Sequence, residues 1–81
     1  MRLTLTAFGG MKDTLGARTH RLDAKEGATV SDVLALLCAE HPDVEPALAT
    51  LAIAVGDELV SRDFALREGD EVGLLPPVSG G

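Results

Sequence analysis

The sequence predicts an α+β domain in which one main helix packs on one face of a mixed β-sheet. Three observations support this fold class. Apolar residues alternate near the start of the chain, helical spacing follows in the middle, and short apolar segments separated by turns complete it. An amphipathic helix has to bury its apolar stripe, and a sheet face is the surface available to it. The chain has 81 residues and is expected to form a single domain, 1–81, from which residues 76–81 protrude.

Apolar residues alternate with polar ones at the start of the chain, over residues 3–8. This period of two predicts a first strand with Leu3 and Leu5 on one side. Residues 9–16 carry glycine at both ends and are expected to form a loop. A weaker strand is expected over residues 17–24, and the two strands would pair as a hairpin.

The strongest helical signal begins after Thr29. Thr29 is a good N-cap, and Asp32, three residues later, can return a hydrogen bond in a capping box. The apolar residues that follow have helical spacing: Val30, Val33, Leu34 and Leu37. The helix is expected to end at His41, because a residue that precedes a proline, here Pro42, avoids helical backbone angles.

Short strands are expected in the second half of the chain, over residues 51–55, 58–60 and 71–75. In the last of these, Val72 and Leu74 would face one way and Leu75 the other. A right-handed crossover through the helix would set the first strand beside the last strand, in parallel. The order of hairpin, helix and further strands is therefore that of a mixed sheet.

The composition limits both the core and the compartment. Aromatic residues make up only 2% of the chain, so we expect an aliphatic core around Phe8 and Phe64. No apolar run approaches the roughly 20 residues of a membrane span, and the start of the chain lacks the features of a secretory signal. The lone Cys38 cannot form an internal disulfide, which fits a reducing cytoplasm. We therefore expect a cytoplasmic protein without a membrane partner.

The net charge of −6 is unevenly distributed. Residues 1–39 hold five basic and four acidic side chains, a balance of +1, whereas residues 40–81 hold two basic and nine acidic ones, a balance of −7. This balance argues against nucleic acid as a partner, because nucleic acid requires clustered lysine and arginine. An acidic half suits docking onto a basic protein, although solubility alone also explains it.

The body of the chain has few candidate catalytic or metal-binding residues. His20 and His41 are far apart in the sequence and lack the spacing of metal ligands. Cys38 borders the apolar face of the helix and is better explained as a small core residue than as a reactive thiol. Ser79 has no nearby base. We therefore expect no bound metal and no bound cofactor.

The end of the chain carries the chemistry that remains. It comprises two prolines, a short spacer and two glycines: Pro76, Pro77, Val78, Ser79, Gly80 and Gly81. The prolines favour an extended segment, and glycines without Cβ make a thread that can enter a narrow slot. The reactive group of such a segment is the carboxylate of Gly81. A frayed end without a function is the alternative explanation.

A carboxylate is a poor electrophile until it is activated, most plausibly as a mixed anhydride with AMP. The chain lacks a recognisable nucleotide site, so ATP would be used by an activating partner. Attack of an amine on the activated carbonyl would give a protein conjugate, and attack of sulfur would give a thiocarboxylate.

Three segments in the second half of the chain resemble a known family. The segments Asp57-Glu58-Leu59-Val60, Leu66-Arg67-Glu68-Gly69-Asp70-Glu71-Val72 and Leu74-Leu75-Pro76-Pro77-Val78-Ser79-Gly80-Gly81 resemble the small subunit of molybdopterin synthase. That family has a ubiquitin-like β-grasp fold. The resemblance covers the whole chain in element order and is strongest over residues 53–81.

The resemblance implies a mechanism and its partners. An E1-like adenylyltransferase would activate Gly81 with ATP, and a sulfurtransferase would convert it to a thiocarboxylate. The loaded tail, residues 76–81, would enter the large subunit of molybdopterin synthase. There its sulfur would pass to cyclic pyranopterin monophosphate and build the dithiolene of molybdopterin. Two small and two large subunits would form a heterotetramer.

A partner surface can also be predicted at the root of the tail. Leu75 faces away from the core side of its strand, and Phe8 and Leu59 could lie on the same outward side. An exposed apolar patch there would suit a protein partner, although scattered exposed leucines are ordinary. Two other functions remain open. One is a sulfur carrier for thiamine synthesis or tRNA thiolation, and the other is a non-reacting ubiquitin-like interaction module.

Overall fold

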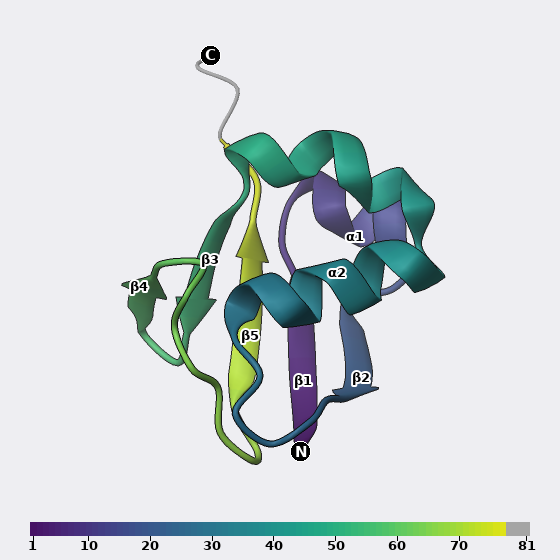
Figure 1. Cartoon of the computed structure of the whole chain (residues 1–81). Coiled ribbons are helices and arrows are strands. Elements are labelled where there is room, and N and C mark those ends of the chain that lie inside the picture. The colour runs from purple at the N-terminus through teal and green to yellow at the C-terminus, as the bar shows by residue number, and fades with distance from the viewer. Residues whose placement is uncertain (78–81) are drawn as a thin grey trace.

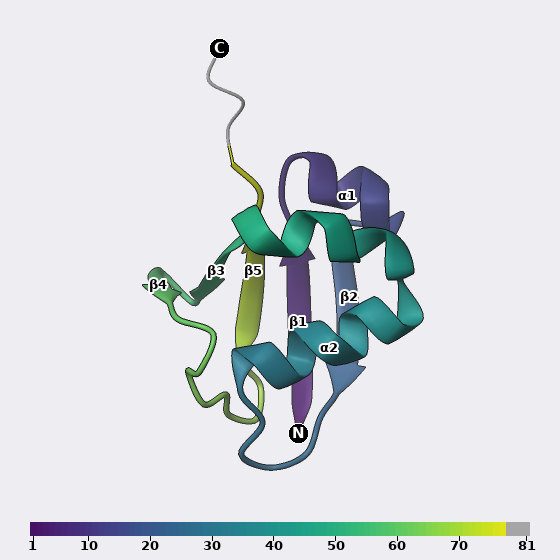
Figure 2. The same cartoon turned by 45° about the horizontal axis from the view of Figure 1, so that its top comes forward.

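A computed structural model describes residues 1–77 of the chain. Its five strands form one sheet in the order β2-β1-β5-β3-β4 (Figure 1). The strands are β1 (Arg2–Ala7), β2 (Thr19–Asp23), β3 (Ala52–Val55), β4 (Glu58–Val60) and β5 (Glu71–Leu75). The helices are α1 (Gly10–Leu15), α2 (Val30–Glu40) and the 3₁₀ helix η1 (Pro42–Thr50). The helices lie on one side of the sheet, and Figure 2 shows α2 and η1 crossing its strands.

The pairing of the strands confirms the predicted mixed sheet. β1 pairs antiparallel with β2 and parallel with β5, while β3 pairs antiparallel with both β5 and β4. The parallel pair requires a crossover, and α2 lies in the connection between β1–β2 and β5. The C-terminal ends of the parallel strands β1 and β5 therefore lie side by side at the same end of the sheet, where Ala7 is opposite Leu74.

The core lies between the sheet and the helices and is entirely aliphatic apart from Met11. Leu5 and Leu74 are fully buried at its centre, and Val30 and Val44 close it from the helical side. The expectation that Phe8 and Phe64 lie in this core is wrong, because they are 43% and 39% exposed. Phe8 follows Ala7 in the strand phase that points away from the helices, and Phe64 lies in the connection before β5.

The predicted capping box of α2 is present. The hydroxyl of Thr29 accepts a hydrogen bond from the Asp32 N–H at 3.3 Å, and the Asp32 carboxylate accepts one from the Thr29 N–H at 2.9 Å. The helix ends at Glu40, and the His41 N–H donates to the Leu37 carbonyl at 2.7 Å. Both ends of α2 therefore fall where the sequence predicts them.

Residues 9–16 do not form the expected loop. Gly10–Leu15 is a short helix, and it buries Met11 and Leu15 against the core. Gly16 ends this helix in the left-handed conformation, with φ 81°. Two buried residues four positions apart are too few to give a periodic signal, and the flanking glycines gave the stronger prediction of a loop.

Arg62 joins the end of η1 to the segment between β4 and β5. Its Nη2 donates to the carbonyls of Leu48 and Leu51, at 2.6 Å and 2.8 Å. A second contact lies at the start of α2, where Thr29 forms an isolated antiparallel β-bridge with Ala65. Within residues 1–77, no helix has the length and apolar character needed to cross a membrane.

Candidate docking face and tail root

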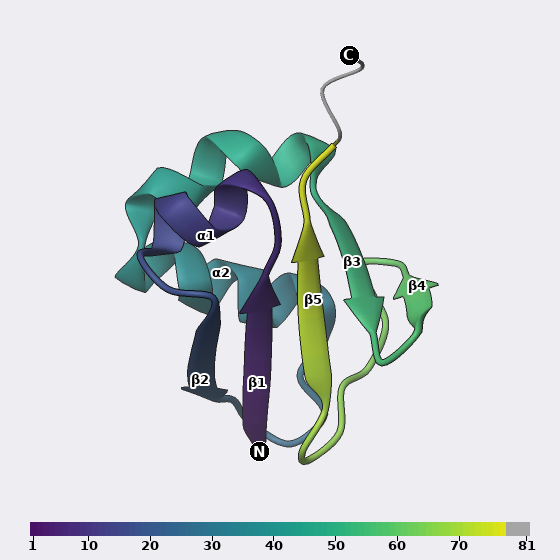
Figure 3. The same ribbon diagram turned by 180° about the vertical axis from the view of Figure 1, so that it is seen from behind.

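The sheet has one face that the helices leave uncovered, here called the open face (Figure 3). Residues of this face alternate with the buried residues of β1, β5 and β3. The pairing aligns them in rows across the sheet, with Thr6 opposite Gly73, Gly73 opposite Ala54 and Ala54 opposite Leu59. Its members include Thr4, Thr6, Phe8, Ala52, Ala54, Leu59, Glu71, Gly73 and Leu75.

The three predicted partner residues occupy this one face. Phe8 and Leu75 line the same hollow, and the ring of Phe8 lies over Gly73, with its Cε2 3.3 Å from the position that a Cβ of Gly73 would take. Leu59 is 73% exposed and pairs with Ala54, outside the residues that line the hollow. The structure thus brings Phe8 and Leu75 together and places Leu59 at the β4 edge of the face.

The root of the tail, Pro76, lies beside the turn between β1 and α1. The Phe8 N–H donates to the Leu74 carbonyl at 3.1 Å, which extends the parallel pairing beyond β1. Gly9 follows with φ 52°, and a Cβ added there would lie 3.2 Å from Cγ of Pro76. Pro76 therefore packs against a position that only glycine can occupy without strain. The sequence shows Gly9 as a loop glycine, and its contact with Pro76 depends on the tertiary fold.

The remaining predicted site residues are Val78, Ser79, Gly80 and Gly81, and they lie outside the described residues. Pro76 and Pro77 are described and follow β5 without regular secondary structure. The open face, the turn at Gly9 and the root of the tail therefore meet at the same end of the sheet.

The surroundings of Cys38, His20 and His41, the other residues considered for chemistry, do not form a reactive site within residues 1–77. Burial raises the pKa of the Cys38 thiol above its ordinary value, and the nearby Glu45 carboxylate raises it further. A thiol in this state is a weak nucleophile at neutral pH. His20 and His41, far apart in the sequence, are neighbours in the fold, with ring centroids 5.0 Å apart in an edge-on arrangement. Within the described part of the chain, no three histidine, cysteine or acidic side chains gather as a metal site.

The element order and the open face define a ubiquitin-like β-grasp protein. The ThiS family matches residues 6–81, and the chain belongs to this family. The protein is thus a ubiquitin-like sulfur carrier.

Similarity to known proteins extends over the whole chain. The chain is 31% identical to the molybdopterin synthase sulfur carrier subunit of Chlamydomonas reinhardtii, and the alignment covers 100% of both chains. Among solved structures, SAMP1 of Haloferax volcanii, a small archaeal modifier protein, superimposes with a TM-score of 0.91 at 30% identity and 100% coverage of both chains. The complex of subunits 1 and 2 of the molybdopterin-converting factor of Helicobacter pylori contains a chain with a TM-score of 0.73, at 28% identity and 100% coverage of both.

Proposed function

We propose that this chain is the sulfur-carrier small subunit of molybdopterin synthase, and that the carboxylate of Gly81 carries the sulfur. The observation that supports this most strongly is the full-length similarity to the Chlamydomonas reinhardtii subunit. The exposed Phe8 and Leu59 on the open face beside the tail root add a second argument, because a partner that covers this face is positioned to receive the tail.

The proposed chemistry starts with activation of Gly81 by an E1-like adenylyltransferase. A carboxylate oxygen attacks the α-phosphorus of ATP, and pyrophosphate leaves. Sulfur at the oxidation level of sulfide, supplied by a sulfurtransferase, then attacks the carbonyl carbon and displaces AMP. The resulting thiocarboxylate is ionised at neutral pH and acts as a soft nucleophile: its sulfur bonds to a carbon of cyclic pyranopterin monophosphate as a carbon–oxygen bond of that substrate breaks. Water then attacks the carbonyl carbon of the thioester so formed and displaces the sulfur, which stays on the pterin, and Gly81 regains its carboxylate.

The catalytic side chains of this reaction are assigned to the large subunit. The body of the small subunit contributes a folded support, the Pro76 root and the docking residues Phe8, Leu59 and Leu75. The Helicobacter pylori complex of two converting-factor subunits supports such an arrangement. We propose a heterotetramer of two small and two large subunits that works in the cytoplasm, with ATP bound only by the activating enzyme.

A second candidate function uses the same terminal carboxylate. The similarity to SAMP1, a modifier protein, favours attachment of the activated Gly81 carbonyl to a lysine amine of another protein. Sulfur transfer toward thiamine or tRNA is the other use of the thiocarboxylate. The non-reacting interaction module would use only the open face.

Reconstitution tests the proposed function. The chain is incubated with its cognate E1-like enzyme, ATP, a sulfurtransferase, the large subunit and cyclic pyranopterin monophosphate, and the dithiolene product is measured. We expect product with the wild-type chain and none with a variant that carries one extra residue after Gly81, because the thiocarboxylate then forms at the wrong position. Activation without product, or accumulation of lysine conjugates, would contradict the molybdopterin role and favour the second candidate.

A further inference from the structure

We infer that the hollow on the open face receives a lysine or arginine side chain of the docked protein partner, with Asp57 and Glu71 as its counter-charges. The inference rests on the proposed function, because it requires a partner that covers this face. It adds the chemistry of the contact and the orientation in which the partner binds.

The floor of the hollow is made of small residues. Thr6, Gly73 and Ala54 lie in one row across β1, β5 and β3, opposite one another in the strand pairing. Gly73 contributes no side chain of its own, and the ring of Phe8 lies over it, so the surface at the centre of the row is low and apolar. An unbranched methylene chain fits along such a floor, and the stems of lysine and arginine are of this kind.

The two ends of the hollow differ in polarity. Phe8 and Leu75 line it at the end next to the tail root, and Glu71 and Asp57 line it at the far end. Glu71 begins β5, and Asp57 lies in the turn between β3 and β4. Among residues 1–77, neither carboxylate takes part in an ion pair or a side-chain hydrogen bond of the fold. A side chain with an apolar stem and a cationic head matches both ends.

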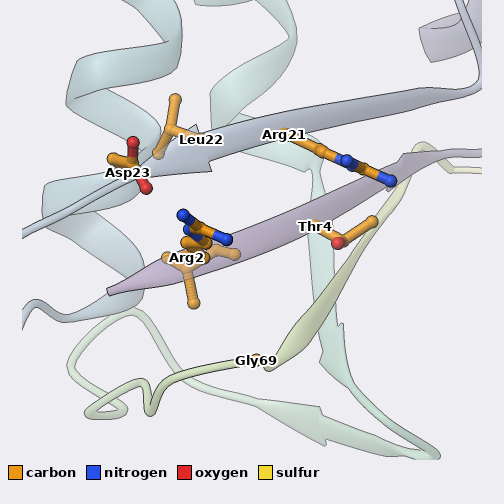
Figure 4. A pocket seen from close by; sticks show the side chains of 7 residues that line it. Arg2, Thr4, Arg21, Leu22, Asp23 and Gly69 are labelled. Carbon is orange, nitrogen blue, oxygen red and sulfur yellow. The ribbon is translucent and has the colours of Figure 1, made fainter.

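The charge on the rest of the open face favours one orientation of that cation. Arg21 lies opposite Thr4, and Thr4 lies opposite Glu71, so the row changes sign from β2 to β5. Arg2 and Arg21 line a second hollow at the β2 side of the face, together with Asp23 (Figure 4). A partner rotated to place its cation over the β2 side would bring like charges together, which penalises that orientation.

The inference is tested by titrating the chain with the cognate large subunit and measuring the dissociation constant at low and at high salt. The variant is Asp57→Asn combined with Glu71→Gln. The matched control is Glu26→Gln combined with Glu40→Gln, which removes the same charge from exposed positions in the β2–α2 turn and on α2. We expect the test variant to bind about 10-fold more weakly at low salt and to lose most of the salt dependence. The control should stay within about 2-fold of wild type and keep the salt dependence.

Two outcomes would overturn the inference, and they can be told apart. If the test variant binds with the affinity and salt dependence of the control, the cation contact is wrong while the partner is right. If the wild-type chain does not bind the large subunit, the proposed function fails and the inference fails with it. Equal urea midpoints of the two double variants verify that the comparison concerns the surface and not the fold.

Discussion

Gly9 couples the body of the domain to the root of its tail. Its φ of 52° belongs to backbone that only glycine adopts freely, and its missing Cβ leaves room for Pro76 at 3.2 Å. Gly16 also has a positive φ, 81°, but nothing lies within 4 Å of where its Cβ would be. The two glycines therefore separate backbone strain from contact with the tail.

The substitution Gly9→Ala is predicted to slow loading of the tail beyond its effect on stability. Both Gly9→Ala and Gly16→Ala should lower the free energy of unfolding, by about 1–2 kcal/mol or more, because each places a Cβ at positive φ. Only Gly9→Ala displaces Pro76 and changes how the tail leaves the body. The rate of adenylate formation with the E1-like enzyme measures this, and equal rates for the two variants would refute it.

Single residues also show what the sequence can and cannot predict. Thr29 and Asp32 were predictable because a capping box is a local hydrogen-bond pattern four residues long. The outward side of Phe8 depends on the phase of β1, and the sequence alone supported either the core or the surface. The contact between Gly9 and Pro76 joins residues at opposite ends of the chain and has no local signal.

At the scale of elements, η1 depends on a contact from outside itself. The helix follows α2 directly and contains Pro46, and its end is fixed by the two hydrogen bonds of Arg62 to the carbonyls of Leu48 and Leu51. These bonds hold η1 against the segment that leads to β5. The guanidinium suits this role because it donates in a fixed fork.

Replacing Arg62 by alanine is predicted to destabilise the fold by about 1–3 kcal/mol, because two half-buried carbonyls lose their charged donor. Urea unfolding measures the loss. Arg18→Ala is the control, since it removes the same charge from an exposed position. A midpoint for Arg62→Ala equal to that of the control would mean that water replaces these hydrogen bonds at no cost.

The elements differ in how well their sequences specify them. α2 carries a cap, helical spacing and a proline stop, and the structure confirms each. The strands β1 and β5 follow from alternation, and their parallel pairing follows from the handedness of the crossover. α1 gives no helical signal in the sequence, because it has six residues, glycines at both sides and only Met11 and Leu15 as buried residues.

In the whole molecule, the helices cover one face of the sheet and leave the other uncovered. The order β2-β1-β5-β3-β4 places the end of β5, and with it the root of the tail, in the middle of the open face's upper edge (Figure 3). The balance of −7 in residues 40–81 includes Asp57 and Glu71 on that face. A partly apolar surface with two acidic residues at its far end therefore adjoins the root of the tail that is proposed to carry the sulfur.

Intact-mass measurement of the protein isolated from its native host tests whether Gly81 becomes a thiocarboxylate. We expect a fraction of the chain whose mass is higher by the replacement of one oxygen by sulfur, located by fragmentation to Gly81. This fraction should disappear from a host that lacks the E1-like enzyme. If the chain carries only the ordinary carboxylate in every growth condition, and never forms an adenylate with the E1-like enzyme and ATP, it is not a sulfur donor.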